Sequence, residues 1–279
     1  MLLLDSGDML FARRRNPFDS RVRKRSRAAF LIEAHGRMGL DAWAVSRLDL
    51  RYGLDALQAE ARAHRIELLS ANLVDRHGAC VLRPYALRER NGVRIGLIGL
   101  TGPWGSPDGA PSPGEGLQLI EPEAAASRAL REIEGRADLV VVLSSLGMDR
   151  DERLAGRVDG LHIILGAGDD RMILIPRRVA DSLLLQPYRR GEYLGMLEIA
   201  FRAPVPPMLD DRDREQLERA LLRTAPGSAD AARLRLRLEP FGRQTSYRAA
   251  LRPLTEQDPD DEALAAAVEK QLELEADLH

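Results

Sequence analysis

Cysteine and aromatic residues are scarce in this sequence, and long hydrophobic runs are missing. A single cysteine, Cys80, excludes an internal disulfide and a thiolate zinc cluster. Aromatic residues make up 4% of the chain and the formal net charge is −2, which argues against a nucleic-acid-binding protein. No run approaches the roughly 18 apolar residues of a membrane-spanning helix, so we expect no membrane span.

What the sequence does contain is an alternation of strand-like and helix-like segments up to about residue 200. Short apolar or β-branched runs predict strands, and amphipathic stretches between them predict helices. The run at 137–144 is apolar apart from Asp138 and Ser144, which is typical of a parallel strand buried on both faces. The alternation predicts a layered α/β domain with a mixed sheet. The other expected strands are 2–5, 42–45, 67–71, 93–100, 161–165, 182–185 and 193–201, and the expected helices are 21–38, 53–65 and 122–134.

The composition changes at Pro-Val-Pro-Pro, residues 204–207. This break predicts two parts, a domain over 1–203 and a charged, helical C-terminal extension over 204–279. The apolar stripes of the extension are sparse, so they need a surface to cover them. That surface is either a partner protein docking on the helices of 207–279 or the chain's own domain. The alternating residues 233–238 fit a short strand or a helix equally well.

The first expected strand ends in a polar turn, Asp5-Ser-Gly-Asp8. Carboxylates at the carboxyl end of a strand lie where α/β proteins build their sites. Asp5 could be the nucleophile of a phosphatase, but such enzymes need a second aspartate two residues on, where this chain has Gly7. Asp8 could instead be a metal ligand after a tight glycine turn. The third interpretation is a polar loop that caps the strand.

The order of the segments resembles the metallophosphoesterase domain of the 5′-nucleotidase family, also called calcineurin-like phosphoesterases. No single segment is specific, but six or seven of them in the right order cover roughly residues 2–201. The resemblance implies a metallo-dependent-phosphatase-like β-sandwich flanked by helices. The matching segments are Leu-Leu-Leu-Asp-Ser-Gly-Asp at 2–8, 43–57, Ser-Ala-Asn-Leu at 70–73, 91–101, 138–147, Gly-Leu-His-Ile-Ile-Leu-Gly at 160–166, and 186–195.

In that family the resemblance implies a pair of divalent ions that activate a bridging water to hydrolyse phosphate esters. About seven nitrogen and oxygen ligands must converge on two such ions. The Gly-Asp that supplies the bridging carboxylate matches Gly7 and Asp8. The family's first strand, with its Asp-x-His ligands, would precede Met1 and is absent from the given residues.

At the remaining positions the sequence departs from the family. The Asn and His of the Gly-Asn-His-Glu motif fall on Arg47 and Leu48, with Asp49 in the place of the Glu. A guanidinium has no lone pair to give to a metal, and leucine cannot act as the acid that the family His supplies. The metal-binding His of Ser-His-Leu-Gly falls on Ser145.

The Gly-His-x-His motif of the family is also replaced. Its two histidines fall on Gly168 and Asp170, of which only Asp170 could still offer an oxygen to a metal. His162, inside an apolar strand, fits a hydrogen-bonded core residue better than a ligand. The remnant of the family's site therefore consists of Asp5, Asp8, Arg47, Asp49, Ser145, Gly168 and Asp170.

These replacements favour a domain that has lost its metals, that is catalytically inactive and that works by binding, with no cofactor expected. Arg47 would then neutralise Asp8 and Asp49 or bind an anion such as phosphate. The alternative is a residual phosphoesterase with Mg²⁺ or Mn²⁺ held by Asp5, Asp8, Asp49 and Asp170, since hard ions take carboxylate ligands.

The sequence leaves the localisation open. The family is commonly periplasmic or otherwise exported in bacteria, whereas residues 1–5 lack the basic start and the long apolar stretch of a signal peptide.

Overall fold

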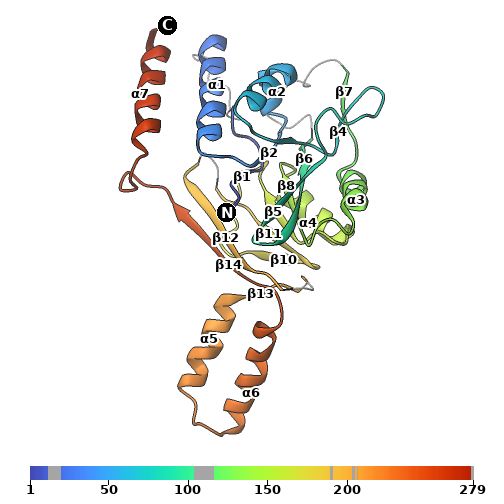
Figure 1. Cartoon of the computed structure of the whole chain (residues 1–279), viewed down its shortest axis with the longest axis vertical. Helices are drawn as coiled ribbons and strands as arrows, with labels where there is room; N and C mark the ends of the chain where they lie inside the picture. The colour runs from blue at the N-terminus through green and yellow to red at the C-terminus, as the bar shows by residue number, and fades with distance from the viewer. Residues whose placement is uncertain (12–19, 104–115, 189–190, 203–204, 206, 278–279) are drawn as a thin grey trace.

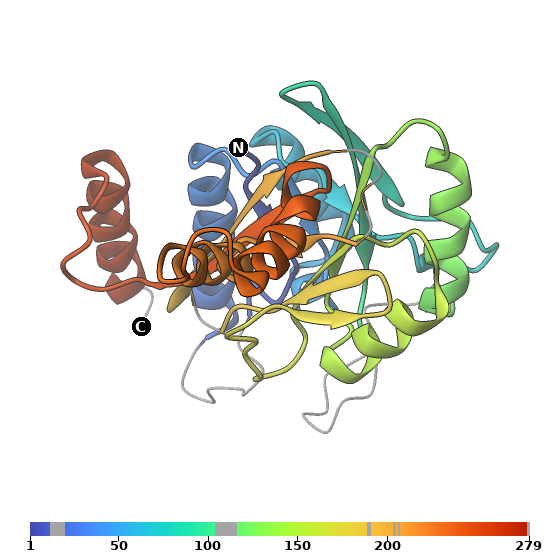
Figure 2. The ribbon, with the colours of Figure 1, turned by 90° about the horizontal axis from the view of Figure 1, so that it is seen from below.

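The computed structural model describes residues 1–11, 20–103, 116–188, 191–202, 205 and 207–277. The chain forms four layers, with two layers of sheet enclosed between two layers of helices (Figure 1). Figure 2 shows α3 (Pro122–Ile133) and α4 (Met148–Arg157) on one side of the sheets and α1 (Arg21–Arg37) on the other. Helix α2 (Leu54–Ala63) packs beside α1. The arrangement is the α/β sandwich with flanking helices that the sequence predicts.

One layer is a six-stranded mixed sheet in the order β10-β11-β9-β8-β6-β5. The pairs β6–β8, β8–β9 and β9–β11 are parallel, and the two edge pairs are antiparallel. Parallel neighbours place their carboxyl ends on one edge of the sheet, where sites in this class of fold are built. The bounds are β5 Tyr85–Arg90, β6 Val93–Leu100, β8 Leu139–Ser144, β9 Ile163–Gly166, β10 Arg177–Val179 and β11 Ser182–Leu185.

The other sheet layer has two pieces. The first is a parallel sheet of β1 (Leu4–Asp5), β2 (Ala42–Ala44) and β3 (Leu68–Leu69). The second is β12-β14-β13, built from β12 (Tyr193–Ala200), β13 (Leu209–Asp210) and β14 (Ser246–Pro253). A short antiparallel pair, β4 (Leu73–Asp75) with β7 (Leu117–Leu119), lies apart from both layers.

Strand β8 shows why the apolar run at 137–144 is buried on both faces. Leu139, Val141 and Leu143 point into the core between the two sheet layers, together with Ala42, Leu69 and Tyr247. Val140 and Val142 point the other way, onto α3 and α4. A third core lies between α1, α2 and β2, with Trp43 at its centre. Successive side chains of a strand face opposite sides, so a strand between two cores must be apolar at every position.

The C-terminal extension is not helical throughout, which corrects the sequence prediction. Strand β14 pairs along its whole length with β12, and β13 pairs with β14, so residues 246–253 complete a sheet begun before residue 203. Tyr247 of β14 is buried in the core between the sheet layers. Strand β14 was not predicted from the sequence, because Arg248 and Arg252 give this segment the charged composition of an exposed helix. The inward-facing residues of β14 alternate with these arginines.

The helices of the extension form two separate features. Helices α5 (Asp211–Leu222) and α6 (Ala229–Leu238) make a hairpin that projects away from the sheets, with α5 resting on β13 and β14 (Figure 1). Helix α7 (Glu262–Asp277) stands beside α1. The ambiguous residues 233–238 are helical, because Ser228 caps the helix by accepting a hydrogen bond from Ala231 N.

Among the described residues, no helix has the length and apolar character needed to cross a membrane. The expected strands at 93–100 and 182–185 match β6 and β11.

Candidate functional site

The polar segments that the sequence singles out converge at the carboxyl ends of the parallel strands. The turn after β1 continues through Ser6, whose Oγ donates a hydrogen bond to Leu165 O on β9, 2.7 Å away. Gly7 has a φ of +100°, and a Cβ there would lie 2.8 Å from both Ala44 O and Ser46 Cβ. Only glycine fits this close approach, so Gly7 brings the turn against the end of β2.

Asp49 anchors this turn. Its Oδ1 accepts hydrogen bonds from the backbone N–H groups of Met9 and Leu10, both at 3.1 Å. Its Oδ2 accepts from the N–H groups of Ser46 at 2.9 Å and Asp8 at 3.2 Å. Asp49 is fully buried in the 3₁₀ helix Asp49–Tyr52. Its carboxylate oxygens are therefore committed to the protein's own backbone.

Asp5, Asp8 and Asp49 form a group of interacting carboxyls, as the sequence predicts. Burial and the nearby charge of Asp8 raise the pKa of Asp49 to about 7, although the backbone donors act in the opposite direction. Burial also raises the pKa of Asp5 to about 6, although the N–H of Gly7 donates to its Oδ1 and lowers it. The charge of Asp8 raises the pKa of Asp5 further. Between pH 6 and 7, Asp5 and Asp49 are therefore partly protonated.

Ser145, which replaces a family histidine, is hydrogen-bonded through its side chain to the backbone that follows β6. Its Oγ accepts a hydrogen bond from Gly102 N at 2.9 Å and donates one to Leu100 O. Gly168 packs on the carbonyl of Ser145: a Cβ at position 168 would lie 2.2 Å from Ser145 O and 2.9 Å from Gly147 N. The backbone of Ser145 thus fills the space that any side chain at 168 would enter.

The loop after β9 is held by Asp169, a residue that the sequence analysis did not single out. Its Oδ2 accepts hydrogen bonds from Met148 N and from the guanidinium of Arg171, and its Oδ1 from Arg171 N and Gln186 Nε2. These donors keep the pKa of Asp169 low despite its partial burial. Asp170, the predicted oxygen ligand, is instead exposed. No sequence motif marks Asp169, because its partners come from α4, its own loop and β11.

Comparison with known proteins gives relatives and a fold. No family model matches the chain. A probable 5′-nucleotidase of Treponema pallidum is 27% identical over 226 residues, which cover 72% of this chain and 36% of the relative. The structure of Thermus thermophilus sulfate thiohydrolase SoxB covers 99% of this chain with a TM-score of 0.74 at 20% identity, and the calcineurin-like phosphoesterase YfkN of Bacillus subtilis covers 99% with a TM-score of 0.66 at 16% identity. This chain covers 43% of the SoxB chain and 84% of the YfkN chain.

In sequence the chain is similar to 5′-nucleotidases, and its fold is that of the calcineurin-like phosphoesterases. The comparisons confirm the resemblance and the fold class that the order of segments predicts. The chain spans about a third of the length of the Treponema relative, so the activity of that whole protein does not extend to this chain by similarity alone.

The residues at the strand ends of this 5′-nucleotidase-like domain do not fit a pair of metal ions. Among the described residues, no three His, Cys, Asp or Glu side chains are placed to hold a metal. Asp49 is bonded to four backbone N–H groups, Ser145 to two backbone groups, and Gly168 has no room for a ligand. Leu48 lies fully buried.

The remaining predicted residues take structural places in the domain. Arg47 lies half-buried in the turn that leads to Asp49. Asn72, of the Ser-Ala-Asn-Leu segment, fixes the end of β6: its Oδ1 accepts from Thr101 N and its Nδ2 donates to Thr101 O, both at 2.8 Å. His162 is a hydrogen-bonded residue of the sheet, as expected, because its Nδ1 accepts from Val140 N at 2.8 Å.

The raised pKa values of Asp5 and Asp49 predict a pH-dependent stability. The folded domain binds protons between pH 4 and 7 that the unfolded chain, with an ordinary aspartate pKa near 4, has released. The free energy of unfolding should therefore fall as the pH rises from about 4 to about 7, by up to about 1.4 kcal/mol per pH unit for each carboxyl. Urea denaturation at a series of pH values measures this slope.

The Asp5→Asn variant supplies the comparison. It should be less sensitive to pH between 4 and 6 than the unmodified protein, whereas Asp159→Asn, at an exposed position, should keep the original slope. Equal slopes in all three proteins would show that Asp5 titrates normally.

Proposed function

We propose that this 5′-nucleotidase-like domain does not hydrolyse phosphate esters and acts by binding. The observation that carries the proposal is the contact between Gly168 and the Ser145 carbonyl, 2.2 Å from where a Cβ would lie. A neighbouring side chain can replace a lost metal-binding histidine only if there is still space for a side chain beside the metal. Here the backbone occupies that space, which supports a cleft that has closed where the family histidines are lost.

The hydrogen bonds of Asp49 support the same proposal. A carboxylate that satisfies four backbone N–H groups contributes to the fold. Moving it to a metal would leave these donors without an acceptor, at a cost of about 1–3 kcal/mol for each of the two that are buried, Leu10 and Ser46. Asp8 keeps its position after Gly7, but one carboxylate is far from the ligand set that two dications need.

A residual phosphoesterase is the competing function, because Asp5, Asp8 and Asp49 do interact. Hydrolysis of p-nitrophenyl phosphate in the presence of Mn²⁺ or Mg²⁺ separates the two. We expect the same background rate for the protein with metal, with EDTA, and as the Asp8→Ala variant. Turnover that rises with Mn²⁺ and disappears in Asp8→Ala would establish the residual enzyme instead.

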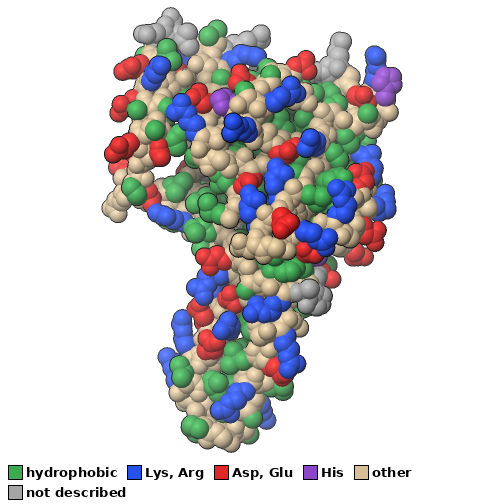
Figure 3. All heavy atoms as spheres, in the orientation of Figure 1, with side chains coloured by type: hydrophobic (Ala, Val, Ile, Leu, Met, Phe, Trp, Pro, Cys, Tyr) green, Lys and Arg blue, Asp and Glu red, His purple; other side chains and the backbone are tan. Residues whose placement is uncertain are grey.

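We propose further that the partner is a protein that docks on the C-terminal helices of 207–279. In support, the α5–α6 hairpin projects from the body, and Figure 3 shows hydrophobic side chains among the charged ones on its surface. Leu222 and Leu236 of the hairpin are 87% and 68% exposed. Isolated exposed leucines are common on protein surfaces, but here two of them lie on one hairpin, whereas its Leu217 and Ala231 are buried.

A binding comparison tests this. The double variant Leu222→Ser/Leu236→Ser should keep the circular dichroism spectrum and melting temperature of the unmodified protein, because neither leucine is buried. A protein that co-purifies with the unmodified chain should be lost from the double variant and retained by a control, Leu174→Ser, at an exposed leucine outside the extension. Equal recovery with all three chains would argue against docking on the hairpin.

A further inference from the structure

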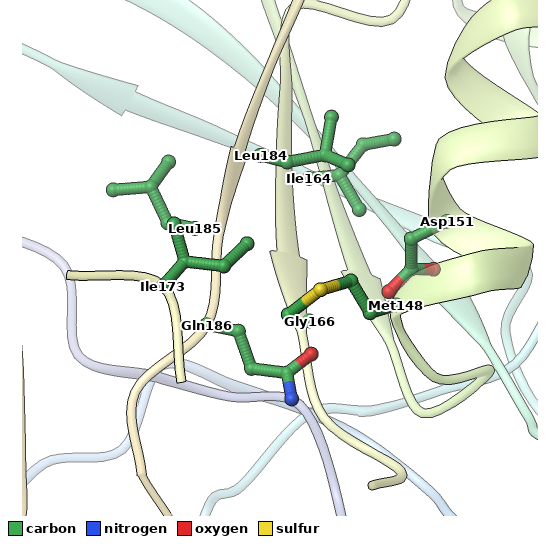
Figure 4. A pocket seen from close by; sticks show the side chains of 8 residues that line it. All are labelled: Met148, Asp151, Ile164, Gly166, Ile173, Leu184, Leu185 and Gln186. Atoms are coloured by element: carbon green, nitrogen blue, oxygen red, sulfur yellow. The ribbon is translucent and has the colours of Figure 1, made fainter. Parts of the chain in front are cut away.

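A small pocket lies between α4, β9 and β11, next to the loop that replaces the family's histidine motif (Figure 4). Its walls are apolar side chains, such as Ile164 and Leu184, together with two polar ones, Asp151 and Gln186. The pocket is too small to admit a water molecule. Any polar atom that faces it must be satisfied by the protein itself.

The amide of Gln186 has a fixed orientation. Its Nε2 donates to Asp169 Oδ1 at 2.6 Å and to Arg171 O at 2.7 Å, and both of these atoms are acceptors. Reversing the amide would place Oε1 against two acceptors, so the assignment is determined by the partners. Gln186 Oε1 therefore faces Gly166, where a Cβ would lie 2.7 Å from it.

Asp151 presents a second oxygen at the same place. Its Oδ1 accepts a hydrogen bond from Ser144 Oγ, at the end of β8. Its Oδ2 is buried and has no hydrogen-bond partner among the described residues. A Cβ at Gly166 would lie 2.9 Å from Asp151 Oδ2, so this atom and Gln186 Oε1 both border one glycine. Two acceptor oxygens thus face a dry space that contains no donor.

An ionised carboxylate in this position would be costly, because it would be buried without a donor for one oxygen. A proton on Oδ2 removes the charge and supplies the missing donor. Burial raises the pKa of Asp151 well above its usual value, and the charge of Asp169 adds to this effect. Ser144 and Arg171 act in the opposite direction.

We propose that Asp151 is a protonated carboxylic acid in the folded domain and that its Oδ2–H donates a hydrogen bond to Gln186 Oε1. This hydrogen bond links α4 to the end of β11 and is sensitive to pH; it is called the joint below. Ionisation at higher pH places a negative charge against Oε1 and near the Asp169 carboxylate, which loosens the joint and the loop that Asp169 holds. The inference does not depend on whether the domain hydrolyses phosphate esters.

The other charged groups around the joint are paired. Arg171 forms ion pairs with Asp169 and with Asp149 of α4. Glu152 of α4 pairs with Arg177 of β10. At the far end of α4, Arg157 pairs with Glu123 of α3. Among these described groups, Asp151 is the carboxyl that forms no ion pair, and the charges of Asp169 and Arg171 act on its pKa from a distance.

The sign of the pH effect follows from the proton balance. The folded protein holds a proton on Asp151 that the unfolded chain releases above pH 4. The unfolding equilibrium constant should therefore rise about tenfold per pH unit from this group, until the pH passes the folded pKa. Asp5 and Asp49, with pKa values of about 6 and 7, contribute below pH 8, so the contribution of Asp151 must be isolated by substitution.

The decisive variant is Asp151→Asn. Asparagine reproduces the protonated acid, since its Oδ1 accepts from Ser144 and its Nδ2 donates to Gln186 Oε1. We expect the variant to fold. With rising pH, its unfolding equilibrium constant should increase less steeply than that of the unmodified protein, by a factor of about ten per pH unit. Infrared spectroscopy at pH 8 should show the carbonyl band of a protonated carboxylic acid in the unmodified protein and in Asp159→Asn, but not in Asp151→Asn.

Three outcomes would overturn the proposal. One is the absence of a protonated-acid band at pH 8 in the unmodified protein, and another is an Asp151→Asn variant with an unchanged pH dependence. The third is an Asp151→Asn variant that fails to fold, because a protonated Asp151 requires that asparagine be accepted at this position.

Discussion

Replacing Gly168 with alanine should destabilise the domain by about 3 kcal/mol or more. The φ of Gly168 is +89°, a region that costs a residue with a Cβ about 1–2 kcal/mol. In addition, the new Cβ would lie 2.2 Å from Ser145 O and 2.7 Å from Ser145 C, so the backbone of the two loops would have to separate. Urea denaturation measures the loss, and hydrogen exchange shows whether it is confined to the loops around Ser145 and Gly168.

Gly227→Ala is the matched control. Gly227 also has a left-handed backbone, with a φ of +82°, but no atom lies within 4 Å of a Cβ placed there. Its substitution should cost about 1 kcal/mol from the backbone conformation alone. Equal losses for the two variants would mean that the space at Gly168 is open, and the argument that the old cleft has closed would fail.

Replacing Asp49 with alanine should destabilise the domain by about 3–5 kcal/mol at pH 7. The backbone N–H groups of Met9, Leu10, Ser46 and Asp8 would lose their acceptor together. Asparagine should recover only part of the loss, because one oxygen serves at most one pair of these donors and its NH₂ group would face the other pair. The free energy of unfolding of both variants is the measurement.

The control here is Glu218→Ala on α5. Glu218 forms an exposed ion pair with Arg214, four residues earlier on the helix, and such pairs contribute within about 0.5 kcal/mol. If Asp49→Ala lost no more than Glu218→Ala, the backbone bonds of Asp49 would not hold the turn, and Asp49 would be available to a ligand.

The sequence predicted the fold well where the signal is local or depends on chain order. The apolar run of β8 and the strand expected at 193–201, which matches β12, each have a physical cause within a few residues of the chain. The grouping of Asp5, Asp8 and Asp49 was expected from the family resemblance, which places all three in the remnant of one site. Strand β14 was missed because its inward residues, such as Tyr247, alternate with arginines, and only pairing with β12 makes it a strand.

The chemistry of the closed cleft depends on contacts that no local pattern shows. The loss of the family histidines is visible in the sequence, but the contact between Ser145 and Gly168 is not. Asp151 stands in a polar stretch, Met-Asp-Arg-Asp-Glu, that is typical of an exposed helix start. Its burial against Gln186, 35 residues along the chain, arises only when α4, β9 and β11 pack together.

Crystals of this protein soaked in manganese, with anomalous diffraction data, show whether the domain still binds a pair of metal ions. We expect no pair of Mn²⁺ ions at the strand ends, with the carboxylate of Asp49 still bonded to the backbone of residues 8–10. Two ions bridged by the carboxylate of Asp8 would contradict this expectation and would restore a dinuclear hydrolase as the function of the domain.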